Sequence, residues 1–383
     1  MSLRDFIAKR IQTQGPLLFA DYMDLALYHP VLGYYARVDR RSGRAGDFYT
    51  SVDVGTQFGE LLARQFAEMW TLTTSPDGAC SRDFSIVEAG AGSGRLARNV
   101  LDHAATAFPA FYEASRFTLI ERSPAGRAAH TDTIGEHAPR LAASSVELPS
   151  RIHGVIFANE LLDALPSHPI VMTETGLREI YVDTDGNRFI ERLGEPSATV
   201  QAHVKRFGIR LAPGWRAEVN PTAVRWVQDA ARRLEHGFLM LIDYGHHASE
   251  LYSLAHATGT LTCYRRHQVA GGDENFPTPP WLQEPGQSDI TAHVDLTAVQ
   301  TTAEQEGLQT IGILDQTYFL LALALEEETA HASEDGIDAL KRRLALKTLL
   351  VPGGIGSTHK VLIFSRGIGT PRLQGCSFSA RTT

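Results

Sequence analysis

Three alternate glycines, Gly90, Gly92 and Gly94, stand between an apolar run at 84–88 and a segment of helical spacing at 95–107. Because glycine lacks a Cβ atom, the backbone of such a turn can bend sharply and come close to a ligand. The first N–H groups of the helix that follows are also available to bind one. The turn therefore predicts a site for a nucleotide-like cofactor, and a plain strand-to-helix turn is the alternative interpretation.

Acidic residues at the ends of two predicted strands narrow the choice of cofactor. Glu88 ends the first strand and Glu121 ends the next, and an acid at such a position commonly accepts hydrogen bonds from ribose hydroxyls. The turn has no phosphate-binding lysine, and its GxGxG spacing differs from the GxGxxG of dinucleotide sites. These features favour S-adenosyl-L-methionine, an adenosyl compound with a cationic sulfonium, over NAD.

A second polar cluster follows the predicted strand 154–158. Asn159 offers both a hydrogen-bond donor and an acceptor, and the Glu160 carboxylate can bind a guanidinium through two parallel hydrogen bonds. Glu160 would then hold a nucleophilic nitrogen toward a methyl group. In the alternative interpretation these residues, with Asp163, cap a helix and satisfy its first N–H groups.

Two further segments carry polar residues whose interpretation stays open. Asp243 ends the predicted strand 238–243 and is the second candidate for a catalytic carboxylate, while Gly245 fits either a ligand contact or a simple strand exit. His293 and Asp295 can share one face of an extended segment. Asp295 can instead cap the helix that begins directly after it. Ligands are too few for a metal site to be predicted.

Apolar runs alternate with segments of helical spacing from residue 84 onward. This alternation predicts an α/β fold with a mostly parallel, doubly wound sheet, in which ligands bind at the carboxyl ends of the strands. The predicted strands are 84–88, 117–121, 154–158, 238–243 and 360–365, and the predicted helices lie near 58–70, 95–107, 124–137, 222–235 and 336–350.

The domain organisation follows from departures from this alternation. Residues 1–80 predict a helical N-terminal extension with a long loop, and 168–220, rich in glycine and proline, predict an inserted β-rich subdomain. The core is predicted at 81–167 and 221–383. Within it, 246–292 lacks periodicity and is predicted to be a long loop, of a kind that is often functional.

Composition excludes several classes of protein. The chain has 383 residues, of which 43% are hydrophobic, so it can form one large domain or two. A net charge of −8 disfavours DNA as a partner. The three cysteines show no CxxC spacing, which indicates a reduced compartment and no structural zinc. No apolar run reaches membrane-spanning length, and no secretory signal is found.

Blocks of sequence spread in order over most of the chain resemble the MidA-like family of S-adenosyl-L-methionine-dependent methyltransferases. The family usually has proline where Ala91 stands, and phenylalanine where Leu161 and Leu296 stand. None of these departures removes a polar group. The matching blocks are 33–35, 46–51, 58–63, 88–94, 121–124, 159–166, 242–245, 259–261, 289–295 and 352–356.

The resemblance implies a class I, Rossmann-like methyltransferase core with S-adenosyl-L-methionine as cofactor. It also implies that Asn159 and Glu160 lie nearest the transferred methyl group, and that the loop around Asp47 closes over the cofactor. The residues that it assigns to cofactor binding are Gly46, Asp47, Phe48, Thr50, Glu88, Gly90, Gly92, Gly94, Glu121 and Asn159.

The favoured function is transfer of a methyl group to a protein side-chain nitrogen, and the resemblance implies an arginine of a respiratory complex I subunit. One alternative is a non-catalytic assembly or scaffold protein of complex I that binds the cofactor. Another is an NAD-dependent oxidoreductase. No metal and no nucleic acid are expected. The expected location is the bacterial cytoplasm, or the mitochondrial matrix in a eukaryote.

Overall fold

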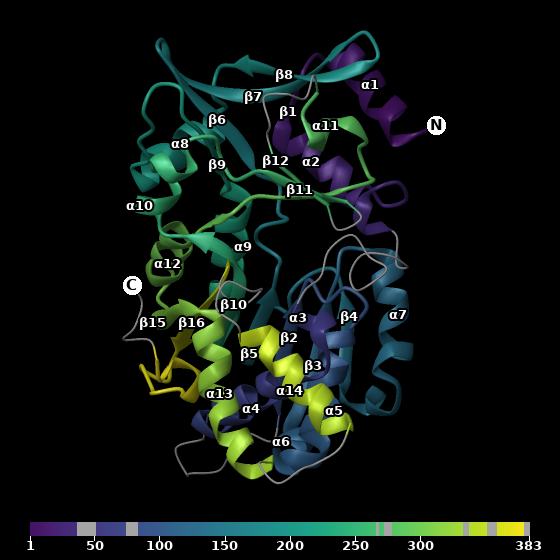
Figure 1. Ribbon diagram of the computed structural model, residues 1–383, viewed down its shortest axis with the longest axis vertical. Helices are drawn as coiled ribbons and strands as arrows, with labels where there is room; N and C mark the ends of the chain where they lie inside the picture. Colours follow the sequence, from purple (N-terminus) through teal and green to yellow (C-terminus); the bar gives the residue numbers. More distant parts are fainter. Residues whose placement is uncertain are drawn as a thin grey trace. The chain divides into compact units, whose positions relative to one another are not determined.

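The computed structural model describes residues 1–36, 51–73, 83–265, 268–271, 278–331, 337–350 and 358–378. The chain divides into two compact units, each built from three segments (Figure 1). Unit 1 comprises Met1–Phe48, Leu162–Val227 and Tyr244–Thr302, and unit 2 comprises Tyr49–Leu161, Gln228–Asp243 and Ala303–Thr383. The domain boundaries expected from the sequence, with an insertion at 168–220, stay a prediction.

Several residues that the sequence analysis singles out lie outside the described part of the chain. They include the loop residues predicted to close over the cofactor. These residues are Gly46, Asp47, Phe48, Thr50, Gly353, Gly354 and Gly356.

Unit 2 is built around a mostly parallel sheet with the strand order β15-β16-β10-β5-β2-β3-β4 (Figure 1). From β10 to β4 all neighbouring strands are parallel, whereas β15 and β16 are antiparallel. The expected α/β fold is therefore confirmed. The strands are β2 (Phe84–Ala89), β3 (Ser115–Ile120), β4 (Leu141–Ser145), β5 (Ile152–Asn159), β10 (Leu234–His246), β15 (Gln309–Asp315) and β16 (His359–Arg366).

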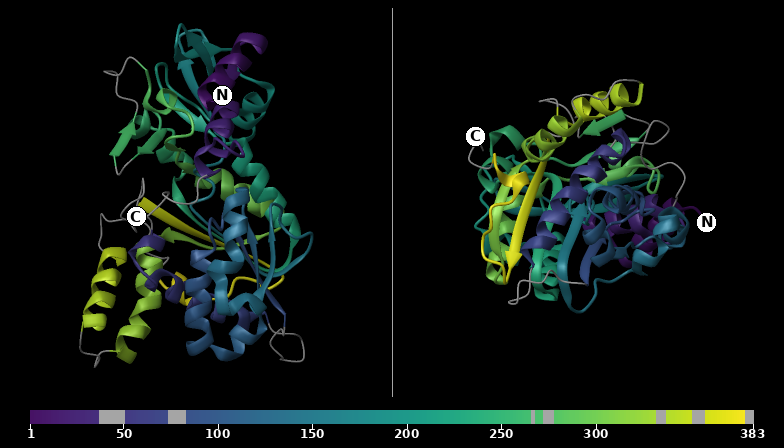
Figure 2. Two further views of the ribbon diagram at one scale, coloured as in Figure 1. Left: turned by 90° about the vertical axis from the view of Figure 1, so that its right-hand side faces the viewer. Right: turned by 90° about the horizontal axis from the view of Figure 1, so that it is seen from below.

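The helices of unit 2 include each one predicted for this part of the chain. Ser123 caps α7 by accepting a hydrogen bond from the Gly126 N–H, with Pro124 in the first helical position. α13 and α14 lie side by side (Figure 2). The helices are α3 (Ser51–Val54), α4 (Gln57–Leu72), α5 (Arg95–Ala107), α6 (Pro109–Ala114), α7 (Pro124–Ile134), α13 (Gln316–His331) and α14 (Ile337–Leu350), with 3-10 turns η2 (Gly135–Arg140) and η4 (Gln374–Cys376).

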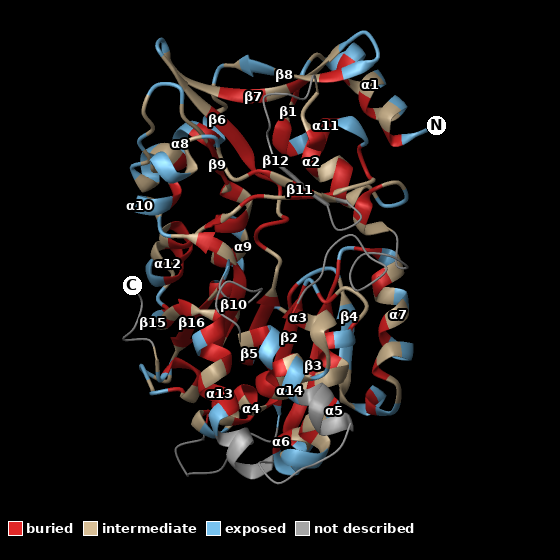
Figure 3. Cartoon of the chain, viewed as in Figure 1, coloured by how far each residue is buried: buried red, intermediate tan, exposed pale blue. Residues whose placement is uncertain are grey.

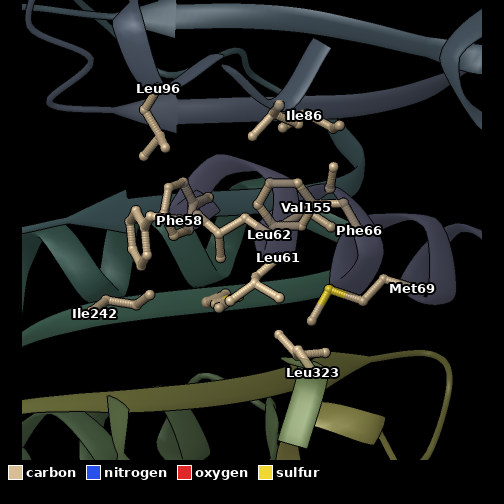
Figure 4. Packing of buried hydrophobic residues seen from close by; sticks show 14 of the residues in the cluster. Phe58, Leu61, Leu62, Phe66, Met69, Ile86, Leu96, Val155, Ile242 and Leu323 are labelled. Atoms are coloured by element: carbon tan, nitrogen blue, oxygen red, sulfur yellow. The ribbon is translucent and has the colours of Figure 1, made fainter. Parts of the chain in front are cut away.

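The central strands of the unit 2 sheet are buried on both faces, as strands of parallel sheets are (Figure 3). In β5, Val155 and Phe157 point to one face while Ile156 and Ala158 point to the other, and all four are at most 2% exposed. The first face packs against α4, as Phe66 and Val155 show in Figure 4. Phe66 of α4 also meets Phe157 edge to face. Burial on both sides explains why these strands appear as continuous apolar runs.

Two glycines let the central strands of unit 2 pass very close to each other. A Cβ atom on Gly154 would lie 2.1 Å from the Ser85 carbonyl oxygen, and one on Gly237 would lie 1.9 Å from the Gly154 carbonyl oxygen. Their φ angles, 143° and 132°, are also ones that L side chains rarely adopt. The register of β2, β5 and β10 therefore depends on glycine at both positions.

Unit 1 contains a five-stranded antiparallel sheet and a separate three-stranded sheet. The helices α1 (Leu3–Gln14) and α2 (Phe19–Tyr28) share a core with the first sheet, in which Tyr22 meets Phe189 edge to face. The five strands are β1 (Leu17–Leu18), β6 (His168–Thr173), β7 (Gly176–Asp185), β8 (Arg188–Gly194) and β9 (Arg216–Val219), and the three are β11 (Thr262–Arg265), β12 (Gln268–Gly271) and β13 (Asp289–Thr291).

The stretch 246–292 differs from the long loop expected from the sequence. Its described residues form several elements, each too short to give a periodic apolar pattern.

Two helices have residues in both units, α9 (Pro221–Arg233) and α12 (Leu296–Gln305). The remaining elements of unit 1 are η1 (Tyr34–Ala36), α8 (Ala198–Phe207), α10 (Ala248–Leu251), η3 (Leu254–His256), α11 (Pro280–Gln283) and β14 (Val294–Asp295). Among the described residues, none of the helices is both long and apolar enough for a membrane crossing.

Gly154→Ala is expected to lower the free energy of unfolding by about 3 kcal/mol or more, since the methyl group meets the Ser85 backbone at a disfavoured φ. Urea unfolding followed by circular dichroism measures the change. The matched control is Gly186→Ala, at φ 57° with open space around the added methyl group, which should cost only about 1 kcal/mol. Equal losses for the two variants would contradict the close approach of β2 and β5.

Candidate functional site

The glycine turn joins the end of β2 to the start of α5. Gly90, Gly92 and Gly94 have φ angles of 73°, 56° and 86°, in the left-handed region that favours glycine. The N–H groups of Gly90 and Ala91 donate to the carbonyl oxygen of Ile120, over 2.9 and 3.0 Å, and tie the turn to the end of β3. Within the described residues, nothing lies within 4 Å of the position that a Cβ atom on Gly92 would take.

The Glu121 carboxylate connects this turn to the start of the next helix. Its Oε2 accepts a hydrogen bond from the Gly92 N–H over 2.8 Å, and its Oε1 accepts one from the Ser123 N–H over 2.6 Å. A carboxylate has about four acceptor positions, so further donors such as ribose hydroxyls can still bind. The acid predicted at the end of the second strand therefore lies at the glycine turn.

Glu88 is buried at the end of β2, with 6% of its surface exposed. Burial raises the pKa of this carboxyl to about 8, and the charge of Glu121 adds to the shift, while a backbone hydrogen bond from Ala97 opposes it. Glu88 is consequently protonated at neutral pH. In that form it can donate as well as accept a hydrogen bond.

Two residues that support the turn were missed by the sequence analysis. His130 Nε2 lies 3.1 Å from the Gly92 carbonyl oxygen, which can only accept, so Nε2 carries the proton; Nδ1 lies 2.8 Å from Ser144 Oγ. Burial lowers the pKa of His130, because the charged ring loses its contact with water. A Cβ atom on Gly126 would lie 2.6 Å from the same carbonyl. Gly126 and His130 are four residues apart on α7, a spacing that places both on one helix face.

The backbone after β5 is held in an unusual conformation. Glu160 has a φ of 51°, which among the described residues is otherwise seen only for glycine. Its N–H donates to the Ile242 carbonyl oxygen over 2.8 Å, and the N–H of Leu161 donates to Asp243 Oδ2 over 3.1 Å. Both contacts come from β10, so the neighbouring strand fixes the position of Glu160.

The side chains at the ends of three strands converge here. Asn159 Nδ2 donates to Glu160 Oε1 over 3.2 Å, and His359 Nε2 lies 3.4 Å from the same oxygen. His359, at the start of β16, is fully buried, whereas the Glu160 side chain is 13% exposed. The Asn159 Oδ1 atom is buried and accepts no hydrogen bond from the described residues. The structure thus brings Asn159, Glu160 and Asp243 together and adds His359.

The helix-capping alternative for this segment is wrong. Asn159 is the last residue of β5, and residues 160–167, all described, form bends, turns and irregular backbone but no helix. Asp163 belongs to unit 1, where its backbone carbonyl accepts from the Ala292 N–H over 3.0 Å. Asp295, by contrast, does cap α12, since its Oδ1 accepts from the Ala298 N–H over 2.9 Å.

Gly245 allows a close backbone contact within unit 1. A Cβ atom there would lie 2.5 Å from the Val294 carbonyl oxygen, because β10 and β14 pair in parallel at this point. This contact matches the interpretation of Gly245 as a structural strand exit.

The residues of unit 2 fit an adenosyl cofactor. The open face of Gly92, just before α5, accommodates a close ligand. Glu121 provides acceptors for ribose hydroxyls, and the buried Asn159 Oδ1 provides an acceptor that no described residue uses. Carboxylates rather than lysines line this edge of the sheet, which suits a cationic sulfonium better than a phosphate chain.

Comparisons with known proteins agree with this fit. A family model of S-adenosyl-L-methionine-dependent methyltransferases matches residues 61–314. A crystal structure of a Burkholderia thailandensis protein bound to S-adenosyl-homocysteine is 29% identical, with a TM-score of 0.85; the match covers 98% of this chain and 95% of that one. The class I core and the cofactor expected from the sequence are therefore confirmed, and NAD is no longer an alternative.

Two curated relatives carry a more specific name. The Drosophila melanogaster protein arginine methyltransferase NDUFAF7 homolog is 26% identical over 96% of this chain and 85% of its own length. The Danio rerio protein arginine methyltransferase NDUFAF7 is 27% identical over 85% of this chain and 77% of its own length. Both are named as mitochondrial proteins.

Glu88→Gln is expected to change how stability depends on pH. The folded-state pKa of about 8 lies above the ordinary value of 4.5, so between these values the folded state binds a proton that the unfolded state has lost. The free energy of unfolding of the natural chain should therefore fall, by about 1 kcal/mol per pH unit, as pH rises through this window. Glutamine does not titrate, so the variant lacks this pH dependence. Urea unfolding should therefore show that the variant gains stability relative to the natural chain as pH rises.

The exposed Glu147 provides the matched control, because Glu147→Gln should leave the pH profile unchanged. Parallel profiles for Glu88→Gln and the natural chain would show that Glu88 is ionised in the folded state.

Proposed function

Because the chain belongs to the family of S-adenosyl-L-methionine-dependent methyltransferases, we propose that it methylates an arginine side chain of a protein, as the names of its fly and zebrafish relatives suggest. The single observation that carries the proposal is the Glu160 carboxylate, held at the end of β5 by two contacts from β10 and facing His359. An arginine needs a carboxylate to orient it, because its guanidinium is cationic at neutral pH.

For cofactor binding we propose the residues of the glycine turn with Glu88, Glu121 and Asn159. Glu121 accepts hydrogen bonds from the ribose hydroxyls while it keeps Gly92 in place. Gly90 and Gly94 shape the turn, and from the resemblance to the MidA-like family we add Gly46, Asp47, Phe48 and Thr50 to the proposed cofactor-binding residues. When bound, S-adenosyl-L-methionine supplies an activated methyl group that a nitrogen displaces in line.

Glu160 has two tasks in the proposed reaction. Its carboxylate accepts two parallel hydrogen bonds from the guanidinium and so points one nitrogen toward the methyl group. As the nitrogen forms its new bond it must lose a proton, and a carboxylate oxygen of Glu160 is the group placed to accept it. Positioning supplies much of the rate acceleration, because a displacement needs its three atoms in line.

The neighbours of Glu160 keep the carboxylate in place. Asp243 accepts from the Leu161 N–H and thereby fixes the backbone that carries Glu160. The Asn159 amide donates to Glu160 Oε1, and His359 contacts the same oxygen from β16. We therefore assign Asp243 a positioning role, and place Asn159 between Glu160 and the cofactor.

For the substrate we propose a subunit of respiratory complex I. The support is the resemblance of blocks over most of the chain to the MidA-like family and the arginine methyltransferase names of its relatives. For the location we propose the cytoplasm of a bacterial cell or, since both relatives are named as mitochondrial, the matrix in a eukaryotic cell.

Glu160→Gln is expected to lower kcat for methyl transfer by about 10²- to 10⁴-fold, because glutamine cannot accept the proton and binds the guanidinium less well. The affinity for S-adenosyl-homocysteine, measured by calorimetry, should stay unchanged. The control is Glu147→Gln, whose side chain is exposed. Full turnover in Glu160→Gln would remove Glu160 from the mechanism.

The proposed substrate predicts that a complex I subunit becomes labelled in a methylation assay. Incubation of the chain with S-adenosyl-L-methionine carrying a labelled methyl group and a lysate that lacks its gene should label a complex I subunit, and mass spectrometry should place the methyl group on arginine. Labelling of other proteins alone would contradict complex I as the substrate. Cofactor binding with no labelled protein would instead favour the scaffold alternative.

A further inference from the structure

Three histidines of unit 1 come together from separate parts of the sequence. His246 ends β10, His256 lies in η3, and His293 lies between β13 and β14. The ring centroid of His246 is 4.5 Å from that of His256 and 5.0 Å from that of His293. One ring nitrogen of each residue lies within 4.8 Å of the others. The sequence analysis considered only His293 and Asp295 and expected no metal site.

The hydrogen bonds of His246 and His256 show that the same nitrogen, Nδ1, carries the proton in each ring. His256 Nδ1 lies 3.1 Å from the Glu250 carbonyl oxygen, which can only accept, so Nδ1 carries the proton. His246 Nδ1 lies 3.1 Å from Glu250 Oε1, also an acceptor. When either ring is neutral, Nε2 therefore holds its lone pair. Metal-binding histidines show this arrangement, in which a carbonyl or carboxylate takes the other N–H group.

The third ring, that of His293, has a nitrogen that no described residue uses. Its Nδ1 atom is buried and has no hydrogen-bond partner among the described residues, although the residue as a whole is half-buried. The His293 backbone is fixed as well, since its N–H donates to Thr260 Oγ1 over 3.0 Å. This nitrogen is placed to bind a cation shared with the other two rings.

We propose that His246, His256 and His293 bind a divalent transition-metal ion of the Zn²⁺ class, with water in a fourth position. Zinc bound by histidine has Zn–N distances of about 2.0–2.1 Å, so the nitrogens of a tetrahedral site lie about 3.4 Å apart. Small side-chain rotations bring nitrogens that lie within 4.8 Å to this separation. Three imidazoles select zinc or a similar ion over Mg²⁺ and Ca²⁺, which prefer oxygen ligands.

A second cluster, formed by Asp102, Glu136 and His137 in unit 2, does not support the same inference. The Arg98 guanidinium lies 2.8 Å from an oxygen of Asp102 and 3.0 Å from one of Glu136. A cation of the protein thus already neutralises these carboxylates. In the histidine cluster, Glu250 contacts the Nδ1 atoms of His246 and His256, and the three rings lie next to one another.

The ion would join three separate elements of unit 1, of which the segment with His293 lies farthest away in sequence. β10 and β14 pair in parallel next to His246, and η3 contributes the third ligand from the intervening stretch. Because binding occurs in the folded state, the ion stabilises that state by mass action. This role is independent of the proposed methyl transfer, so failure of either proposal leaves the other standing.

The test is titration of the purified, chelator-treated chain with Co²⁺, a coloured substitute for Zn²⁺, followed by displacement with Zn²⁺. The natural chain should bind one Co²⁺ with the intense visible absorption of a tetrahedral site and lose it to Zn²⁺. Zn²⁺ should also raise the melting temperature, and a chelator should reverse the shift, while Mg²⁺ should have no effect.

Variants distinguish this site from adventitious binding. His256→Ala and His293→Ala should each weaken Co²⁺ affinity by more than roughly a hundredfold, and Glu250→Gln by about tenfold, since it orients His246. His153→Ala removes an exposed histidine of unit 2 and is the control, with unchanged binding. S-adenosyl-homocysteine affinity reports that the variants remain folded. No tetrahedral Co²⁺ spectrum in the natural chain, or an equal spectrum in all variants, would overturn the proposal.

Discussion

The Glu121 carboxylate is the interaction on which the candidate cofactor site depends. It accepts one hydrogen bond from the turn after β2 and one from the start of α7, so a single side chain fixes two loops at the same edge of the sheet. His130 and Gly126 then pack against the Gly92 carbonyl from α7. All of these contacts need β2 and β3 to be parallel neighbours, because only then do both strands end at one edge.

The proposed catalytic group depends on the next pair of strands. The positive φ of Glu160 is a conformation that costs free energy, and it is maintained by hydrogen bonds to Ile242 and Asp243 on β10. The two glycines that bring β2, β5 and β10 close together lie near the starts of β5 and β10. Backbone packing within the sheet thus positions both Glu121, the proposed ribose acceptor, and the carboxylate Glu160.

The sequence predicts the strands that are buried on both faces, since β2, β3, β5, β10 and β16 appear as apolar runs. It misses β4 and β15, because Leu141–Ser145 is largely exposed and Gln309–Asp315 is only partly buried. Glu121 and Glu160 are predictable from their place after a strand. His359 and the His246, His256 and His293 cluster are not, because strand order and pairing, rather than sequence spacing, bring these residues together.

A crystal structure of the chain with S-adenosyl-homocysteine tests the central claim most directly. The account predicts the ribose hydroxyls within hydrogen-bond distance of the Glu121 carboxylate, with the hydrogen bonds of that carboxylate to Gly92 and Ser123 retained. A ribose bound elsewhere on the chain, or a Glu121 carboxylate turned away from the glycine turn in the complex, would contradict it.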